Sequence, residues 1–244
     1  MLRLPDKISG FLFDLDGVVT DTAAVHAAAW KRMFDDFLSS RGLPPFRLPE
    51  DYTLYVDGKK REDGTRSFLA SRGVVLPEGD VNDPPEAETV HGLGTRKNAL
   101  VLALIAEGGV QVFPDAVALL KTVRAGGGRT ALVSSSANAE AVLTSAGLLD
   151  LFDARIDGVV ARELGLPGKP APDMFLAGAR AVGLPPAECA AFEDALAGVA
   201  AGRAGGFALV VGVDRIRDGA HGPALTGSGA DVVVTDLREL VEQR

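Results

Sequence analysis

Two pairs of carboxylates are the strongest candidates for chemistry in this chain, because each pair directly follows an apolar run. Asp14 and Asp16 close the segment GFLFDLD, and Glu193 and Asp194 close the segment CAAFED. Side chains at positions i and i+2 of a strand point the same way, so Asp14 and Asp16 would repel each other. A divalent cation would offset this repulsion and the cost of burying carboxylates. From the first pair alone an alternative stays open, in which one aspartate caps the next helix and the other is hydrated.

Two other polar residues follow apolar runs in the same way. Ser134 lies at the end of TALVSS, and Lys169 lies in GKPAPD, just beyond another candidate strand. Ligands of open parallel sheets bind outside the carboxyl ends of the strands. Four strand ends that carry two acidic pairs, a hydroxyl and an ammonium group therefore predict one convergent site. Taken alone, Lys169 would be interpreted as a lysine of a surface loop.

The elements that would position these residues alternate along the chain. Short runs rich in Val, Leu, Phe and Ala, without polar alternation, are typical of strands covered on both faces. We expect strands at 10–16, 130–135, 154–160, 189–194, 207–213 and 230–236. We expect helices between them at 115–127, 138–148, 172–184 and 194–206. This alternation predicts an α/β fold with a parallel sheet and helices on both faces.

Residues 24–107 interrupt the alternation. Their pattern is mostly helical, with polar turns and a proline-rich stretch at 76–88. We interpret them as a helical domain inserted after the first strand, so that residues 1–23 and 108–244 form the α/β core domain. The glycine-rich segment at 221–231 is interpreted as a surface loop.

Composition narrows the classes of function. The chain of 244 residues has a formal net charge of -8 and no long basic patch, so we expect no nucleic-acid partner. Its single cysteine, Cys189, allows neither an intramolecular disulfide nor a cysteine-based zinc site. No apolar run reaches membrane-spanning length and the first residues lack the pattern of a signal peptide. We therefore expect no membrane partner and a cytoplasmic location.

The motifs DLDGVVTDT, VSSS, GKPAPD and FED, in this order, resemble the four motifs of the haloacid dehalogenase-like superfamily. The resemblance covers residues 8–23 and 112–236, and the combination of motifs is highly specific. Within the superfamily, FDLDGVVTDTAAVHAAAWK is similar to the start of the β-phosphoglucomutase subfamily. The resemblance implies a Rossmann-like core domain and an inserted helical domain that serves as a cap.

The resemblance also implies roles for the polar residues. Asp14 would be the nucleophile that forms an aspartyl-phosphate, and a carboxylate suits this because it is ionised at neutral pH. Asp16 would donate a proton to the leaving oxygen and accept one from the next acceptor. Mg²⁺ would be held by Asp14, the Asp16 backbone carbonyl, Glu193 and Asp194.

The remaining core motifs would stabilise charge on the transferring group. Ser134 would donate a hydrogen bond to a phosphoryl oxygen, and Lys169 would neutralise charge on the phosphoryl group and the nucleophile. Ser135, Ser136 and Asn138 lie in or next to VSSS. By resemblance these three residues would contact substrate, the last two at a second, distal phosphate.

Residues of the inserted segment are the other candidates for substrate binding. Thr22, His26 and Trp30 are spaced by four residues and share one helical face. Core packing of Trp30 and a structural role of His26 are the plain alternatives. By resemblance these three residues would lie near the hinge and the cleft, with His26 helping to place Asp16 or substrate.

The resemblance assigns the distal phosphate to Gly58, Arg61 and Lys97, where a guanidinium suits two-pronged phosphate binding. The chain departs from the subfamily at several positions. Ala137 replaces a lysine, and Lys59, Lys60 and Gly64 also differ. An additional acidic, proline-rich turn occupies residues 77–92.

The resulting hypothesis is a Mg²⁺-dependent phosphotransferase acting on a sugar phosphate. Resemblance to the subfamily implies interconversion of β-glucose 1-phosphate and glucose 6-phosphate, by a monomer. The alternatives are a sugar-phosphate phosphatase, a dehalogenase, a phospho-accepting module of the receiver type and a binding protein with a decayed site. A receiver needs neither an inserted domain nor a leaving-group acid such as Asp16, and halide departure needs no such acid either.

Overall fold

The chain divides into two compact units, each with its own core. The computed structural model describes residue 5 and residues 7–241. One unit, called here the sheet unit, comprises Met1–Asp21 and Gln111–Arg244, and the other, the helical unit, comprises Thr22–Val110. Within the described residues no helix combines the length and apolarity needed to cross a membrane.

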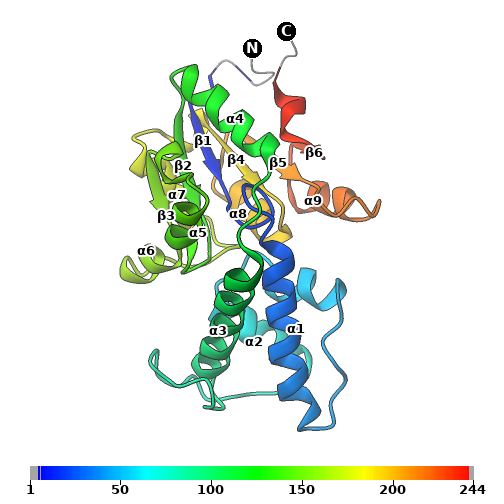
Figure 1. Ribbon diagram of the computed structural model, residues 1–244. Coiled ribbons are helices and arrows are strands. Elements are labelled where there is room, and N and C mark those ends of the chain that lie inside the picture. Colours follow the sequence, from blue (N-terminus) through cyan, green and yellow to red (C-terminus); the bar gives the residue numbers. More distant parts are fainter. Residues whose placement is uncertain (1–4, 6, 242–244) are drawn as a thin grey trace. The chain divides into compact units, whose positions relative to one another are not determined.

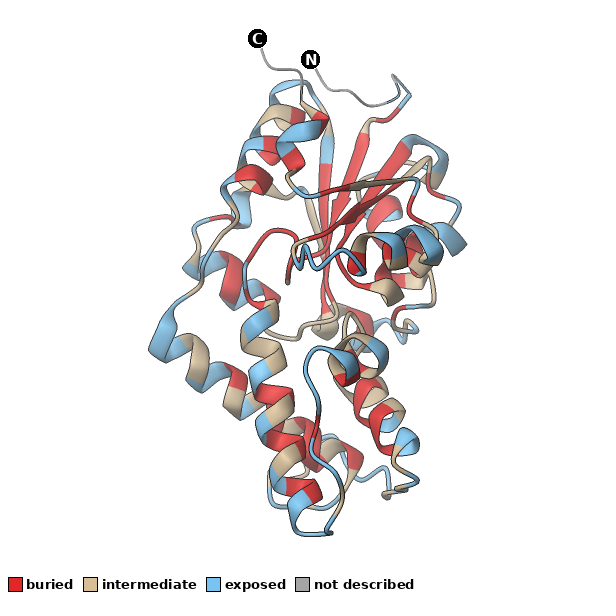
Figure 2. Ribbon diagram, turned by 90° about the vertical axis from the view of Figure 1, so that its right-hand side faces the viewer, coloured by how far each residue is buried: buried red, intermediate tan, exposed pale blue. Residues whose placement is uncertain are grey.

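The sheet unit is built on a parallel sheet, which confirms the predicted α/β fold. Within residues 7–241 the sheet has six strands in the order β3-β2-β1-β4-β5-β6, and neighbouring strands run parallel (Figure 1). The strands are β1 (Gly10–Phe13), β2 (Arg129–Val133), β3 (Ala154–Ile156), β4 (Cys189–Glu193), β5 (Leu209–Val213) and β6 (Val232–Val234). The central strands are almost entirely buried, as Figure 2 shows by colour.

Helices cover both faces of this sheet. They are α4 (Pro114–Ala125), α5 (Ala139–Ser145), α6 (Gly158–Glu163), α7 (Asp173–Ala181), α8 (Leu196–Ala204) and α9 (His221–Ser228). Short 3-10 helices lie at η2 (Leu149–Leu151), η3 (Pro186–Glu188) and η4 (Leu237–Leu240). Leu12 packs in a buried cluster with residues of α7 and α8. Phe11 points to the opposite face, because side chains alternate along a strand, and its ring lies close to the turn that follows α4.

Two expectations for this unit are wrong, and in both cases an aspartate side chain accepts from backbone amides where a helix begins. Segment 154–160 is a strand only to Ile156, because the Asp157 carboxylate accepts from the amides of Val159 and Val160 at 2.9 Å and begins α6. Segment 221–231 is mostly helix α9 rather than a surface loop. Asp218 accepts from the His221 amide at 2.8 Å where α9 begins, and the helix ends at Gly229, whose φ is 114°.

The helical unit contains α1 (Ala23–Ser39), the π-helical turn η1 (Tyr52–Val56), α2 (Arg61–Ser71) and α3 (Val90–Gly108). Its core is aromatic, with the rings of Phe34 and Phe68 centred 4.2 Å apart. Helix α3 begins at Val90, where the Thr89 hydroxyl accepts from the Gly92 amide at 2.9 Å.

The acidic, proline-rich turn of the helical unit is attached by arginines of α2, of α3 and of the turn that follows α1. Arg66 pairs with Glu78, Arg41 pairs with Glu88 at 2.6 Å, and Arg96 Nε donates to the Pro85 carbonyl at 2.7 Å. Because these contacts span the turn, it is a docked part of the unit rather than an open loop.

Candidate active site

The register of the sheet brings the polar strand ends into one row. Phe13 pairs with Leu132 of β2 on one side and with Phe192 of β4 on the other. The residues that come next along the chain are Asp14, Val133 and Glu193, and these three therefore lie side by side. The Asp14 amide continues the ladder by donating to the Phe192 carbonyl at 3.0 Å. Asp14 and Glu193 are both buried, so their carboxylates meet inside the protein rather than in water.

Lys169 joins this row from the loop between α6 and α7. Its side chain is fully buried, and its Nζ donates to Asp14 Oδ1 and to Glu193 Oε1, each at 2.5 Å. A third donation goes to the Val133 carbonyl at 3.1 Å. One ammonium group thus contacts all three positions of the row, and the interpretation of Lys169 as a surface-loop lysine is wrong.

A third carboxylate completes an acidic cluster. Asp14, Glu193 and Asp194 are buried, and each offers a carboxylate oxygen within 4.8 Å of those of the other two. Gly17 makes room for this cluster, because it has a φ of 89° and a Cβ on it would lie 1.8 Å from Asp194 Oδ2. Gly198 of α8 does the same on the other side, where a Cβ would lie 1.8 Å from Glu193 Oε1.

The charges of the cluster fit a divalent cation. Three carboxylates gather beside the ammonium group of Lys169, and burying this much negative charge is costly. Burial raises the pKa of Glu193 to about 7, Lys169 opposes this shift, and Asp14 adds to it. Burial alone would lower the pKa of Lys169, but Asp14 and Glu193 outweigh it, so the pKa lies above the ordinary value of 10.5 and Lys169 stays charged. A hard cation with oxygen ligands would favour the ionised carboxylates.

The other core candidates lie on the same edge of the sheet. Ser134 directly follows β2 and is fully buried, and its Oγ accepts from the Ser136 amide at 3.1 Å. Ser136 Oγ in turn accepts from the Asn138 amide at 3.2 Å, which places these residues and Ser135 in a tight turn before α5. Asp16 lies two residues beyond Asp14 and is less buried, with a backbone bridge to Thr20.

Within the helical unit, three of the predicted residues meet. Lys97 Nζ of α3 lies 3.0 Å from His26 Nδ1 of α1 and 5.0 Å from the centre of the Trp30 ring. Both Lys97 and Trp30 are buried. Because an ammonium group only donates, Nδ1 accepts and the ring proton of the neutral imidazole is on Nε2. Burial lowers the pKa of His26 well below 6.5, with further lowering by the charges of Lys97 and Arg61.

The remaining residues predicted in the helical unit flank this group. Thr22 is buried at the start of α1, where its carbonyl accepts from the His26 amide at 2.9 Å. Gly58, with a φ of 69°, forms the turn before α2, whose first residue is Arg61. Arg61 Nη1 donates to the Gly94 carbonyl of α3 at 3.3 Å. Its Nε makes no hydrogen bond among the described residues and lies 3.4 Å from Glu62 Oε1, with which it forms an ion pair.

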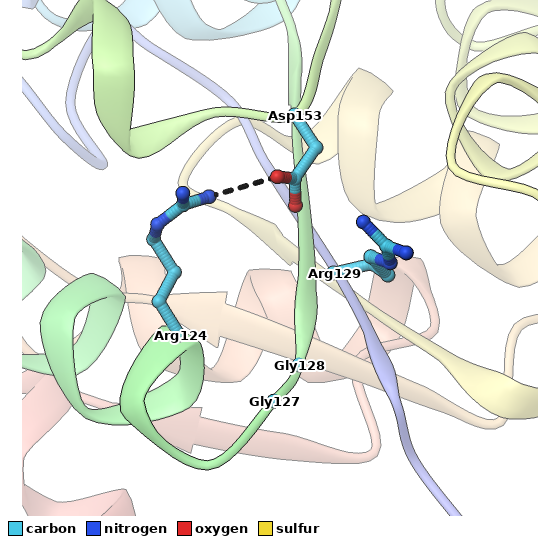
Figure 3. A pocket seen from close by; sticks show the side chains of 5 residues that line it. All are labelled: Arg124, Gly127, Gly128, Arg129 and Asp153. Carbon is cyan, nitrogen blue, oxygen red and sulfur yellow. Dashed lines mark hydrogen bonds and ion pairs between the residues drawn. The ribbon is translucent and has the colours of Figure 1, made fainter.

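One pocket of the sheet unit is not lined by any predicted site residue. It measures about 290 Å³ and is lined by Arg124, Gly127, Gly128, Arg129 and Asp153 (Figure 3). It lies where β2 begins, whereas the acidic cluster lies where the strands end. The Arg124–Asp153 ion pair at 3.0 Å crosses it.

The fold and the buried acidic cluster bridged by Lys169 can now be compared with those of known enzyme families. A sequence model of the haloacid dehalogenase-like hydrolases matches residues 8–206, and the chain belongs to that family. It is 52% identical over 247 residues to a β-phosphoglucomutase of Mycobacterium bovis, covering 99% of this chain and 94% of that protein. The fructose-1-phosphate phosphatase YqaB of Escherichia coli is 30% identical over 210 residues, covering 84% of this chain and 96% of that protein.

Solved structures agree with this assignment. A crystal structure of β-phosphoglucomutase from Clostridium difficile has a TM-score of 0.71 at 27% identity, covering 96% of this chain and 93% of that one. The predicted family and fold class are therefore confirmed, and the chain is an enzyme of this family.

Sequence reasoning gave no role to several residues that the structure places next to the cluster. His221 is buried, and its Nε2 lies 2.8 Å from the backbone carbonyl of Asp194. Arg215 contacts the backbone carbonyls of Gly17 and Val18, each at 3.3 Å. The segment that holds both residues lies near β5, and no local sequence pattern links it to the acidic motifs.

Proposed function

We propose that the protein is a magnesium-dependent β-phosphoglucomutase that interconverts β-glucose 1-phosphate and glucose 6-phosphate. One observation carries the chemistry: Lys169 bridges Asp14 and Glu193 beside a cluster of three buried carboxylates. Near full-length identity of 52% to a β-phosphoglucomutase favours this substrate.

Asp14 is the nucleophile in this proposal. One of its carboxylate oxygens bonds to phosphorus while the bond from phosphorus to the sugar oxygen breaks, which gives an aspartyl-phosphate and a sugar hydroxyl. Lys169 contacts Asp14 Oδ1 at 2.5 Å, so it orients the carboxylate and offsets negative charge as the phosphoryl group approaches. Ser134 donates its hydroxyl proton to a phosphoryl oxygen.

Asp16 moves the protons. It gives its proton to the leaving sugar oxygen in the first half-reaction and takes one from the attacking hydroxyl in the second. In the second half-reaction phosphorus passes from Asp14 to that hydroxyl, and Asp14 returns to a carboxylate. A bisphosphorylated sugar joins the two half-reactions of a full turnover.

Asp14, Glu193, Asp194 and the backbone carbonyl of Asp16 would hold the magnesium ion. The ion supplies positive charge that lets a dianionic phosphate approach the carboxylates. Glu193 is held for this task by Lys169 on Oε1 and by the Ala195 amide, which donates to Oε2 at 2.8 Å.

The helical unit acts as the cap and binds the part of the substrate that does not react. Arg61 offers its guanidinium to the distal phosphate, assisted by Lys97 and the turn at Gly58. Thr22, His26 and Trp30 line the approach, with His26 in its neutral form. In the sheet unit, Ser135, Ser136 and Asn138 would offer hydroxyl and amide groups to substrate.

A sugar-phosphate phosphatase is the second candidate, because the chain is 30% identical to a fructose-1-phosphate phosphatase. The two functions share the first half-reaction and differ in whether water or a sugar hydroxyl attacks the aspartyl-phosphate. Family membership and full-length relatives leave the receiver-like and decayed-site alternatives without support.

The deciding assay uses purified protein, β-glucose 1-phosphate, Mg²⁺ and a trace of β-glucose 1,6-bisphosphate. A mutase converts the substrate to glucose 6-phosphate, measured with a coupled dehydrogenase, and releases little inorganic phosphate. Free phosphate without glucose 6-phosphate would establish the phosphatase instead.

The nucleophile is tested by Asp14→Asn, which keeps the size of the side chain and removes its charge. We expect turnover to be abolished while the circular dichroism spectrum stays that of the unmodified protein. Retained turnover in this variant would refute the assignment of Asp14.

A further inference from the structure

The segment that follows β5 contacts both loops that carry the acidic cluster. Arg215 donates through Nε to the Gly17 carbonyl and through Nη2 to the Val18 carbonyl, each at 3.3 Å. His221 Nε2 lies 2.8 Å from the Asp194 carbonyl. A carbonyl only accepts, so this ring nitrogen carries the proton. One loop follows Asp14 and the other contains Asp194, so one segment holds both loops by their backbone.

The Arg215 guanidinium is itself fixed in place. Asp115, at the start of α4, binds it in a two-pronged ion pair at 2.8 and 3.1 Å. The Cζ atom of Arg215 lies over the Phe113 ring, 4.0 Å from the ring centre. The Asp115 carboxylate also accepts from the Leu237 amide at 2.8 Å. An arginine bound on so many sides loses little freedom when it contacts the two carbonyls.

Two aspartates stiffen the segment from Asp214 to His221. Asp214 Oδ1 accepts from the amides of Ile216 and Arg217 at 3.1 and 2.9 Å. Asp218 Oδ1 accepts from the amides of Ala220 and His221, both at 2.8 Å. Helix α9 then packs against α8, the helix that follows Asp194. The positions of Arg215 and His221 are therefore coupled.

The two loops touch each other where the segment holds them. A Cβ on Gly17 would lie 1.8 Å from Asp194 Oδ2, so the Gly17 backbone already lies against this carboxylate. A shift of the Gly17 loop by a few tenths of an ångström would displace Asp194 relative to Asp14. Magnesium tolerates little such displacement, because it requires near-octahedral geometry at about 2.0–2.1 Å.

We propose that Arg215 and His221 are positioning residues for the cation site, which fix the Asp14 loop and Asp194 relative to each other through backbone carbonyls. This rests on the proposed magnesium chemistry of the cluster. Neither residue touches the reacting atoms. Residues that orient the ligands of a metal typically change its affinity by about 10–100-fold when they are replaced.

The test measures Mg²⁺ affinity directly, by isothermal titration calorimetry of the full-length, metal-free protein without substrate. His221→Leu removes the donor, and His221→Gln retains a side-chain N–H that can reach a carbonyl. Arg215→Lys keeps a charge for Asp115 but loses the flat, multiple donor. We expect the Kd for Mg²⁺ to rise about tenfold in His221→Leu and in Arg215→Lys, and His221→Gln to restore most of the affinity.

The matched control is Arg124→Lys, in the pocket of Figure 3. Arg124 also pairs with an aspartate, Asp153 at 3.0 Å, and also donates to a backbone carbonyl, that of Leu151 at 3.4 Å. It lies where the strands begin, so we expect an unchanged Kd for Mg²⁺. A merely structural role of Arg215 or His221 would lower the melting temperature of the metal-free protein without changing this Kd.

The outcomes are distinct. Folded His221→Leu and Arg215→Lys proteins whose Kd stays within twofold of the unmodified value would overturn the positioning role and leave the proposed function intact. An unmodified protein that binds no Mg²⁺ would overturn both. Should Arg215→Lys fail to fold, the comparison of His221→Leu with His221→Gln decides, because only a positioning donor is rescued by glutamine.

Discussion

Replacing Lys169 by methionine would separate the electrostatic role of this residue from its packing role. Methionine fills a similar volume but carries no charge, so the carboxylates of Asp14 and Glu193 would lose the ammonium group that now contacts each at 2.5 Å. Breaking a buried ion pair from one side costs about 3–5 kcal/mol, because a buried charge is left uncompensated. For a protein of this size, that corresponds to a fall in melting temperature of about 6–20 °C.

The same substitution should act on the metal in the opposite direction. Without Lys169 the cluster gains one net negative charge, so Mg²⁺ should bind at least as tightly as before and should recover part of the lost stability. Turnover should nevertheless fall by about 10²–10³-fold, as for the loss of one donor that stabilises a developing charge.

The assay combines differential scanning calorimetry in EDTA and in Mg²⁺ with steady-state kinetics. Lys121→Met is the matched control, because Lys121 is an exposed lysine of α4 and should change stability by less than about 0.5 kcal/mol. A Lys169→Met protein with the unmodified melting temperature in EDTA, or with unmodified turnover, would refute the reasoning.

Two other perturbations test the close packing at Gly17 and the titration of His26. Gly17→Ala should weaken Mg²⁺ binding about tenfold or more in calorimetry, because its Cβ would lie 1.8 Å from Asp194 Oδ2. The control is Gly42→Ala, which should leave Mg²⁺ binding unchanged, because Gly42 also has a positive φ, 64°, but a Cβ there would lie in open space. His26 has a pKa below 6.5 in the folded state, so as pH drops the unfolded chain takes up the imidazole proton at a higher pH than the folded protein does. The free energy of unfolding should therefore fall as pH drops below about 6.5. Melting curves from pH 7 to 5 should show a smaller loss in His26→Gln, and equal losses would contradict this.

The fold was predictable to the extent that local patterns determine it. Uninterrupted apolar runs marked the strands, and the four motifs marked which strand ends carry chemistry. The glycines and proline of segment 221–231 disfavour helix, so the segment was expected to be a loop. The Asp218 carboxylate, outside the segment, accepts from the amide of His221, the first residue of α9. At 154–160 the run of valines suggested a strand, and the capping by Asp157 outweighed that preference.

The site was predictable in its residue types but not in its contacts. The motifs indicated that Asp14, Lys169 and Glu193 converge. The strand register places Asp14 beside Glu193, and the path of the loop between α6 and α7 brings one ammonium group to both carboxylates. Arg215 and Asp115 are 100 positions apart, and no periodicity connects them. The assignment of nucleophile, acid and phosphate-binding residues stays a prediction until the variants are measured.

The strand order has a consequence for how the protein is made. Strand β1 leaves the ribosome early, yet it is flanked by β2 at residues 129–133 and by β4 at residues 189–193. One edge of β1 therefore has no strand partner until residue 133 has been made, and the other edge has none until residue 193. The intervening helical unit has its own aromatic core and lies wholly between β1 and β2 in the sequence, so it can form meanwhile. The centre of the sheet, and with it the row of Asp14, Val133 and Glu193, is complete only after β4 has been made.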